Sequence, residues 1–285
     1  MSKIAIMSDV HANINGLNLF LDDISKRGVN KIFCLGDLVS KYFYPKAVVD
    51  IVRDSCSIVI KGNCDYCIVE NNIFKFTRKN LGIDGLDYLQ NLKNIERINI
   101  NGIEINLFHS NINDLESIYN PLFDNTKIDN FKRVIYDYNE LFIGNKPQVS
   151  FTGHTHQCYI GIEENNNIKI IKDDEIIIND KQKVIINVGS IGEHNHIKVL
   201  ENRKFSPIID PFLSYCILDD NYEQGNIHIK MIKIPYKEEL LKVYLDYKDF
   251  QIKNDIKNFE EETMKIENSL IKMGYDEKTL KLKRG

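Results

Sequence analysis

Residues 3–11 read KIAIMSDVH, an apolar run that stops abruptly at Asp9 and His11. A short run without alternation of polar and apolar residues is typical of a strand buried on both faces, as at the centre of a parallel sheet. Apolar residues then recur at helical spacing over 14–27, and a second buried strand is expected over 31–35. This strand–helix–strand order predicts an α/β fold with a parallel sheet.

The rest of the chain extends this alternation and then changes to β-structure. The expected elements are helices over 47–54, 78–92 and 127–142, and strands over 57–60, 95–100, 103–108 and 148–152. Short runs rich in Ile and Val over 157–190 predict a β-meander, which 214–218 and 227–232 continue. The charged segment from 236 is expected to be helical. No internal repeat and no linker rich in Gly, Ser or Pro divides the chain.

The composition is ordinary for a globular protein, with 43% hydrophobic and 27% charged residues among 285. A formal net charge of −4 argues against binding of bulk nucleic acid or of an anionic membrane, although one local patch suffices for a small phosphorylated substrate. No apolar stretch is long enough for a membrane span, and the N-terminal run is too short for a signal peptide. The six cysteines are therefore expected to be reduced thiols in the cytoplasm.

Residue types that bind metals follow the ends of five expected strands. They are Asp9-Val10-His11, Gly36-Asp37, Gly62-Asn63, His109 and Gly153-His154-Thr155-His156. Each motif alone is common and has an ordinary explanation as a polar turn. In open α/β sheets, however, ligands bind outside the carboxyl ends of the strands. Five such ends in this order therefore predict that the side chains converge on one rim of the sheet.

The chemistry of these side chains suits a pair of divalent cations. Residues two apart in an extended segment point to the same side, which would pair Asp9 with His11 and His154 with His156. Carboxylate and imidazole groups bind Mn²⁺, Fe, Zn²⁺ and Ni²⁺, and a carboxylate such as Asp37 can bridge two metals about 3.5–4 Å apart. Two cations with both aspartates and a bridging hydroxide would keep a small positive charge, which favours a phosphate anion. Bound water would ionise near neutral pH and provide that hydroxide as a nucleophile.

The motifs together resemble the signature of the calcineurin-like metallophosphoesterases, which runs Asp-X-His, Gly-Asp, Gly-Asn-X-Asp/Glu, a His, and Gly-His-X-His. Cys64 and Asp65 complete the third motif. Asn187-Val188-Gly189-Ser190 is similar to the family's Asn-Pro-Gly-Ser turn. Two later segments, Ser214-Tyr215 and Ile234-Pro235-Tyr236, resemble a small bacterial and archaeal phosphodiesterase-like subfamily. The resemblance spans about residues 3 to 240.

The resemblance implies a calcineurin-like four-layer sandwich, in which two mixed β-sheets are flanked by helices. It places a metallophosphoesterase domain over 1–235 and a helical C-terminal extension over 236–285, packed on the same domain. The implied ligands of the first metal are Asp9, His11, Asp37 and His156, and those of the second are Asp37, Asn63, His109 and His154. Mn²⁺ is the first choice of metal, with Fe, Zn²⁺, Ni²⁺ or Mg²⁺ as alternatives. The residues implied in catalysis are Asp37, Asn63, Cys64, Asp65 and His109.

Cys64 departs from the protein-phosphatase branch of the family, which has a proton-donating His at this position. A thiol is a mediocre general acid, and phosphodiesterase-like members share this substitution. Asp65 either orients a neighbour or caps the next helix. Cys64 and Cys67 also form a Cys-X-X-Cys pattern, which we interpret as two unpaired thiols because no second pair of metal ligands accompanies it.

Several further residues are candidates for substrate contacts, and each could equally be an ordinary polar residue of the surface or of a loop. They are Asn13, His194, His196, Lys41, Tyr42, Tyr44 and Arg78. The expected function is a dinuclear metal-dependent phosphodiesterase on a small phosphoester. The alternatives are a phosphomonoesterase or protein phosphatase, and a non-catalytic scaffold of the same fold. The sequence indicates no oligomeric state.

Overall fold

The structure is a computed structural model, and it describes residues 3–40, 44–71, 74–111, 115, 148–164, 167–171, 173–179, 182–193, 195–199, 205–209, 212–220, 226–236, 241, 245, 267, 268, 270, 271, 275 and 276. Its helices are α1 (Ile14–Lys26), α2 (Pro45–Ser55), α3 (Asn63–Glu70) and α4 (Lys75–Gln90). Its strands are β1 (Lys3–Met7), β2 (Lys31–Cys34), β3 (Ile58–Val59), β4 (Ile95–Ile100), β5 (Ile103–Phe108), β6 (Gln148–Thr152), β7 (Tyr159–Glu164), β8 (Asn167–Ile170), β9 (Glu175–Ile178), β10 (Val184–Asn187), β11 (Asn195–Val199), β12 (Phe205–Ile209), β13 (Phe212–Asp219) and β14 (Ile227–Pro235).

The described strands form two six-stranded mixed sheets and one two-stranded sheet. The first sheet has the order β3-β2-β1-β13-β14-β9, and its strands β1, β2 and β3 run parallel. The second has the order β4-β5-β6-β10-β7-β8, and its strands β5, β6 and β10 run parallel. Strands β11 and β12 pair separately. The prediction of an α/β fold with two mixed sheets is therefore confirmed.

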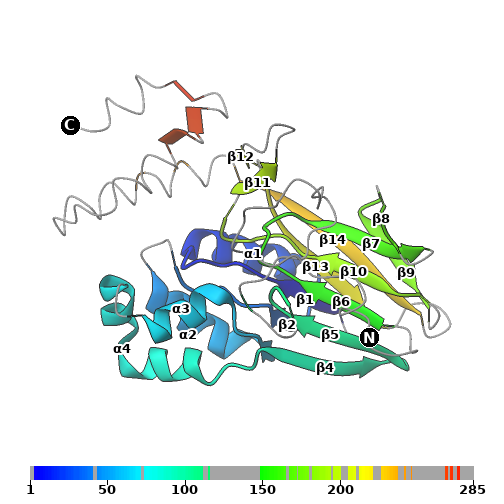
Figure 1. The fold of residues 1–285 in the computed structure, drawn as a ribbon, viewed down its shortest axis with the longest axis horizontal. Coiled ribbons are helices and arrows are strands. Elements are labelled where there is room, and N and C mark those ends of the chain that lie inside the picture. The colour runs from blue at the N-terminus through cyan, green and yellow to red at the C-terminus, as the bar shows by residue number, and fades with distance from the viewer. Residues whose placement is uncertain are drawn as a thin grey trace.

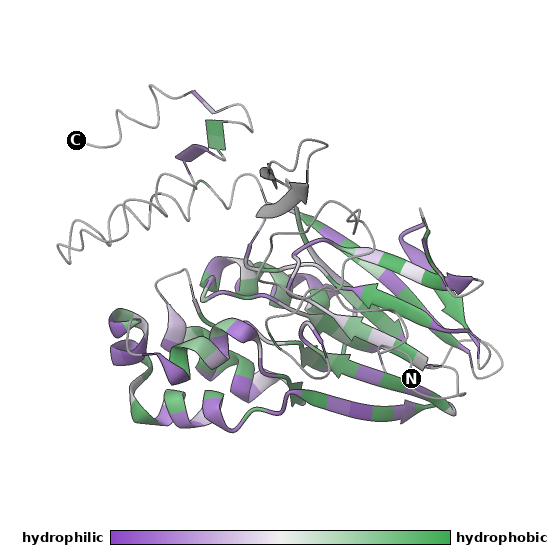
Figure 2. Cartoon of the chain, viewed as in Figure 1, coloured by the Kyte–Doolittle hydropathy of each residue, from purple (hydrophilic) through white to green (hydrophobic). Residues whose placement is uncertain are grey.

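Among the described residues, two large hydrophobic cores hold the layers together. One fills the space between the two sheets and receives Ile4 and Ile6 from β1. The other lies between the first sheet and the helices and receives Ala5 and Met7 from the same strand. Because alternate side chains of a strand point to opposite faces, β1 is buried on both faces, as its sequence predicted. Helices α1 to α4 lie beside the first sheet in Figure 1, and in Figure 2 they mix hydrophilic and hydrophobic residues while the inner strands are largely hydrophobic.

The expected β-meander over 157–190 is wrong in its connections. Only β7 and β8 form a local hairpin. Strand β9 pairs with β14 in the first sheet, and β10 returns to the second sheet between β6 and β7. Strands β13 and β14 likewise pair beside β1 instead of continuing the second sheet. Short Ile- and Val-rich runs are suitable for either sheet, so their sequence predicts strands but not their partners.

Some expected elements were missed or cannot be placed. Helix α3, which begins at Asn63 itself, was not predicted, and neither were β11 and β12. The helix expected over 127–142 lies outside the described residues, as does almost all of the extension from 236. Within the parts that the structure describes, no helix combines the length and apolar character needed to cross a membrane.

Candidate metal centre

The candidate centre lies at the rim of the sandwich where parallel strands of both sheets end. Loops after β1, β2 and β3 bring residues from the first sheet, and loops after β5, β6 and β10 bring residues from the second. Hydrogen bonds tie these loops together: Gly153 N–H donates to the His109 carbonyl at 2.8 Å, and His154 N–H donates to Asp9 Oδ2 at 2.9 Å. The predicted convergence on one rim is therefore what the structure contains.

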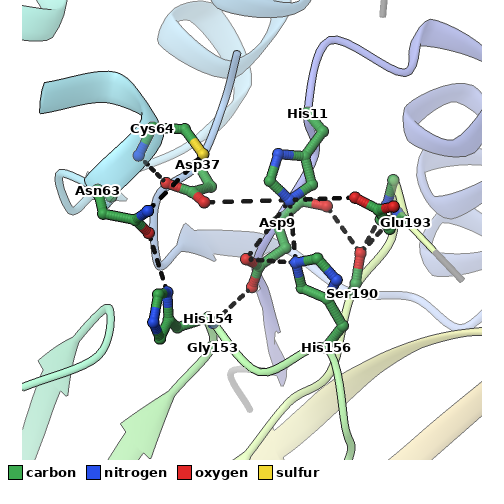
Figure 3. A network of polar contacts seen from close by, with 12 residues as sticks. Asp9, His11, Asp37, Asn63, Cys64, Gly153, His154, His156, Ser190 and Glu193 are labelled. Atoms are coloured by element: carbon green, nitrogen blue, oxygen red, sulfur yellow. Dashed lines mark hydrogen bonds and ion pairs between the residues drawn. The ribbon is translucent and has the colours of Figure 1, made fainter. Parts of the chain in front are cut away.

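The first group of side chains gathers around Asp9, which is fully buried. Its Oδ1 atom lies 3.3 Å from His156 Nε2 and 3.7 Å from His11 Nε2. The two imidazole nitrogens lie 3.0 Å from each other. Asp37 Oδ2 lies 4.0 Å from His11 Nε2 and connects this group with the next one. Figure 3 shows these rings and carboxylates pointing toward one another.

The second group gathers around Asn63, the first residue of α3. Its Oδ1 atom lies 3.0 Å from His109 Nε2 and 2.9 Å from His154 Nδ1. His109 Nε2 also lies 3.5 Å from Asp37 Oδ2. The other ring nitrogen of His109, Nδ1, donates to the Leu35 carbonyl at 2.7 Å, which orients the ring and leaves Nε2 as the atom that faces the group. Asp37 therefore lies between the two groups, and Asp9 also approaches the second one, with Oδ1 at 4.0 Å from His109 Nε2.

The backbone carries these side chains in a conformation that the sequence did not suggest. Five of the seven predicted ligands have positive φ angles, between 51° and 67°: Asp9, His11, Asp37, His154 and His156. We expected Asp9 and His11 to share a side because the segment was extended, and that reason is wrong. Left-handed turns, not a strand, direct them inward. Non-glycine residues in this region are strained by about 1–3 kcal/mol each, and such strain is typical of functional sites.

Two glycines allow the loops to approach closely enough. A Cβ atom on Gly62 would collide with Oδ1 of Asp37, and one on Gly153 would lie 2.5 Å from Oδ2 of Asp9. Asp37 Oδ1 instead accepts the Cys64 backbone N–H at 2.8 Å. The glycines before Asn63 and His154 therefore each provide space for a carboxylate that belongs to a different strand end.

Asp65 supports the site from behind and does not face it. Its Oδ2 atom accepts the Gly62 N–H at 2.9 Å, which caps α3, and its Oδ1 atom accepts the N–H groups of Leu38 and Val39 at 2.9 and 3.3 Å. Burial first, and then the nearby Asp37 charge, raise the pKa of this carboxyl to about 7. Both structural roles considered for Asp65 are present, and its expected place among the catalytic groups is corrected to a positioning role.

The electrostatics of the rim favour a cation. Burial raises the pKa of Asp9, but His109 and His156 outweigh it and lower that pKa to about 2. Burial likewise opposes ionisation of Asp37, yet His109 holds the pKa of its carboxyl well below the usual range. Burial lowers the pKa of His109, whereas Asp37 and Asp9 raise it to about 10. The same negative potential that holds a proton on His109 would attract a metal ion in its place.

The donor atoms also fit divalent metal ions. Two atoms that bind one cation at about 2.0–2.2 Å lie within roughly 4.4 Å of each other, and the distances given above meet this limit. Oδ1 of Asp9 is buried and accepts no hydrogen bond, which is costly for a carboxylate oxygen unless a cation is its partner. Among the described residues, three clusters present ligand atoms within 4.8 Å of one another: Asp9, His11 and His156; His11, Asp37 and Cys64; and Asp9, Asp37 and His109.

Asn13 is a structural residue and not the substrate contact that we expected. Its Oδ1 atom accepts the Gly16 N–H at 3.0 Å and caps α1. Its Nδ2 atom donates to the Gly192 carbonyl at 2.8 Å and to the Tyr236 hydroxyl at 2.6 Å. The side chain is 2% exposed, so its polar atoms serve the protein itself.

Of the other residues that we expected to contact substrate, two are described by the structure with their side chains. The Arg78 guanidinium donates to the carbonyls of Ile68 and Val69 and so serves the end of α3 instead of a phosphate. Tyr44 is exposed. The remaining candidates lie outside what the structure describes: His194, Lys41, Tyr42 and the side chain of His196.

Glu193 is a residue of the site that the sequence analysis missed. Its Oε2 atom lies 3.9 Å from His11 Nε2, and the residue is 8% exposed. It follows the Asn187–Ser190 turn, whose Ser190 hydroxyl donates to the Asp9 carbonyl at 2.8 Å and accepts the Glu193 N–H at 2.7 Å. The sequence does show an acidic residue three positions after this turn. It does not show that the side chain points toward His11, because that depends on how the turn packs against Asp9.

Comparison with known proteins gives consistent results. A sequence model of the calcineurin-like phosphoesterase superfamily domain matches residues 2–201. The uncharacterized protein MJ0912 of Methanocaldococcus jannaschii is 28% identical over 247 residues, which cover 82% of this chain and 88% of that protein. Among solved structures, a metallophosphoesterase from Sphaerobacter thermophilus has a TM-score of 0.63 at 21% identity and covers 90% of this chain and 96% of its own. The hypothetical protein PH1004 from Pyrococcus horikoshii has a TM-score of 0.59 at 15% identity, with coverages of 93% and 97%. These two structures share the fold.

Proposed function

The chain belongs to the calcineurin-like phosphoesterase superfamily, and from this premise we propose that it is a dinuclear metal-dependent phosphodiesterase acting on a small phosphoester. The single observation that carries the proposal is the convergence of two groups of ligand atoms on the two sides of Asp37. A fold shared with the family would not by itself require it. A non-catalytic scaffold would have no need for seven metal-binding side chains on five separate loops, or for the strained backbone that holds them.

We assign two cation positions to these side chains. The first position is formed by Asp9, His11, Asp37 and His156, and the second position by Asp37, Asn63, His109 and His154. The assignment is supported by the short distances between their ligand atoms and by the buried Oδ1 atom of Asp9, which accepts no hydrogen bond. Oxygen and imidazole ligands suit Mn²⁺, our first choice, and also Fe, Zn²⁺, Ni²⁺ or Mg²⁺.

Divalent ions bound here would supply a water of lowered pKa as the nucleophile and would stabilise the charge that develops on the phosphoryl oxygens. The protein residues of the site differ in how far they are exposed, and this difference indicates their roles. Asp9 and His109 are fully buried and exclude water from the inner side. Asn63, Cys64 and His156 are only partly buried, so the substrate would approach from their side. The Leu35 carbonyl holds the His109 ring in the tautomer that a ligand needs.

The preference for a diester rests on Cys64, which stands where the protein phosphatases of this family have a proton-donating His. Its backbone N–H donates to Asp37, and its thiol lies within the cluster of ligand atoms around Asp37. The thiol is then the group placed to give a proton to the leaving oxygen. A substrate with a good leaving group needs that proton least, so an activated aryl diester is a suitable first substrate.

The deciding experiment compares bis-p-nitrophenyl phosphate with p-nitrophenyl phosphate in the presence of Mn²⁺ and again after chelation. We expect hydrolysis of both esters that depends on the metal, with the higher kcat/KM for the diester. A higher value for the monoester would replace the diesterase with a monoesterase. Absence of any metal-dependent hydrolysis would favour the scaffold.

We further propose that the reaction takes place in the cytoplasm and that the partner of the chain is its small phosphoester, not bulk nucleic acid or a membrane. The net charge of −4 supports this, because nucleic acid and anionic membranes bind basic surfaces. None of the six cysteines, all of which the structure describes, forms a disulfide, which suits a reducing compartment. Salt-dependent retention on a DNA column would contradict the proposal.

A further inference from the structure

Glu193 brings a third acidic side chain to the first position. Its Oε2 atom lies 3.9 Å from His11 Nε2, and Figure 3 shows its carboxylate on the side of His11 opposite Asp37. With 8% of its surface exposed, the carboxylate is not an ordinary solvated loop acid. A buried carboxylate is stabilised by nearby positive charge, and a cation at the first position would supply such charge next to Glu193.

The turn that carries Glu193 is fixed against the ligand loop of Asp9. The Ser190 hydroxyl accepts N–H groups from Gly192 at 3.2 Å and from Glu193 at 2.7 Å. The Gly192 N–H also donates to the Asp9 carbonyl at 3.0 Å, and a Cβ atom at Gly192 would collide with the Val10 carbonyl. The backbone of Glu193 is therefore held at a set distance from the first position.

A count of charges indicates what this acid changes. Two divalent cations with Asp9, Asp37 and the attacking hydroxide leave one positive charge, and Glu193 reduces it to zero. Asp65 is a further buried acid, but its oxygens accept three backbone N–H groups behind the Asp37 loop. Glu193 faces an imidazole of the site instead. A phosphate monoester carries two negative charges at neutral pH and a diester carries one, so a neutral centre penalises the monoester more.

We propose that Glu193 is a specificity-determining residue whose negative charge disfavours dianionic phosphomonoesters relative to monoanionic phosphodiesters. The proposal rests on the function proposed above and deepens it. It assigns the preference for diesters to a buried charge beside the first position, in addition to the identity of residue 64.

The test uses the full-length chain loaded with Mn²⁺ at pH 8, where the monoester is fully dianionic. Glu193→Gln removes the charge with almost no change in shape, and Glu193→Asp keeps it. Glu164→Gln is the matched control, since Glu164 is half exposed and pairs with Lys169 on the surface. We expect Glu193→Gln to raise the ratio of monoester to diester kcat/KM by about tenfold. Glu193→Asp should restore most of the original ratio, and Glu164→Gln should leave it unchanged.

A second readout does not depend on turnover. Calorimetry with inorganic phosphate and with diethyl phosphate measures how a dianion and a monoanion bind to the metal-loaded protein. We expect Glu193→Gln to tighten phosphate binding by about tenfold while diethyl phosphate binding changes less. Metal analysis should give the same metal content in the variant as in the natural chain.

The outcomes separate this proposal from the proposed function. If the natural chain hydrolyses neither ester, the phosphodiesterase proposal fails, and the phosphate titration still tests the charge of Glu193. If the natural chain is active but neither the rate ratio nor phosphate binding responds to Glu193→Gln, the specificity proposal is overturned. Loss of one metal ion in Glu193→Gln would also overturn it, because Glu193 would then be a ligand.

Discussion

The two proposed cation positions share Asp37 but differ in the charge around them. The first position would have a second carboxylate ligand from Asp9, with a third carboxylate nearby from Glu193. The second would add an amide and two imidazoles as ligands, from Asn63, His109 and His154, with Asp9 Oδ1 at 4.0 Å from His109 Nε2. Attraction between the cation and ionised carboxylates would therefore contribute most of the metal binding at the first position. The second depends on orientation, because Asn63 Oδ1 lies within 3.0 Å of both imidazole nitrogens and the Leu35 carbonyl fixes one ring.

This difference implies an order of loading. A divalent cation gains most where two ionised carboxylates are already gathered at a buried site. Neutral ligands bind less strongly and rely on being held ready by their hydrogen-bond partners. We therefore expect the first position to bind its metal more tightly and the second to fill at higher metal concentration.

The largest effect should come from Asp37→Asn, which removes the carboxylate that both positions share. We expect activity to fall by at least about 1000-fold, because both cations lose an ionised ligand and the charge on the phosphoryl group loses its stabilisation. Metal analysis after gel filtration should find less than one Mn²⁺ per chain. Activity within tenfold of the natural chain would contradict the bridging role.

The next largest effect should come from Asn63→Ala, which removes a neutral ligand from the second position alone. We expect activity to fall by roughly 100-fold, while the tighter of the two metal-binding steps keeps its affinity. Asp9→Asn is the paired variant and should weaken the tighter step instead. Calorimetric titration with Mn²⁺ measures the affinity of each binding step in both variants. If both variants lose both steps equally, the two positions do not differ as proposed.

A smaller effect is expected in the natural chain when metal is removed. At free Mn²⁺ about 100-fold above Kd, binding at one position stabilises the folded state by about 2.7 kcal/mol, or roughly 4–5 °C in Tm for a chain of this size. Thermal denaturation during a Mn²⁺ titration should show two increments, the first at lower metal concentration. A single increment that accompanies two bound metals would mean that the positions fill together.

The convergence of these side chains could be predicted from the sequence because they follow the ends of expected strands, and the ends of parallel strands share an edge. His109 and His154 belong to the second sheet and Asp9 to the first, so the edge includes both sheets. The backbone geometry could not be found in the same way. The left-handed conformations at Asp9 and His154 are imposed by contacts with other loops, for which a local pattern has no signal.

The fold shows the same limit. Strand β1 and helix α1 were predicted because burial on both faces and helical spacing are local properties of the sequence. Strand β9 was predicted as a strand but assigned to the wrong sheet, since its partner β14 lies about fifty residues away. Glu193 belongs to this second kind: its identity is visible in the sequence, and its proximity to His11 arises only from tertiary packing.

The smallest effect on the centre should come from Asn13→Ala, although the variant loses stability. The change removes the cap of α1 and leaves the Gly192 carbonyl and the Tyr236 hydroxyl without their donor, which should cost about 2–3 kcal/mol of unfolding free energy. Asn13→Asp keeps the oxygen that caps α1 but loses the Nδ2 donor, so its stability should lie between that of the natural chain and that of Asn13→Ala. Because Gly192 precedes Glu193, a loosened turn should affect the first position before the second. We therefore expect a reduced midpoint in urea, two bound metals, and a KM for the diester within about twofold of the natural value, since enzyme that remains folded keeps its ligands. A KM raised more than tenfold with unchanged stability would instead return Asn13 to the substrate.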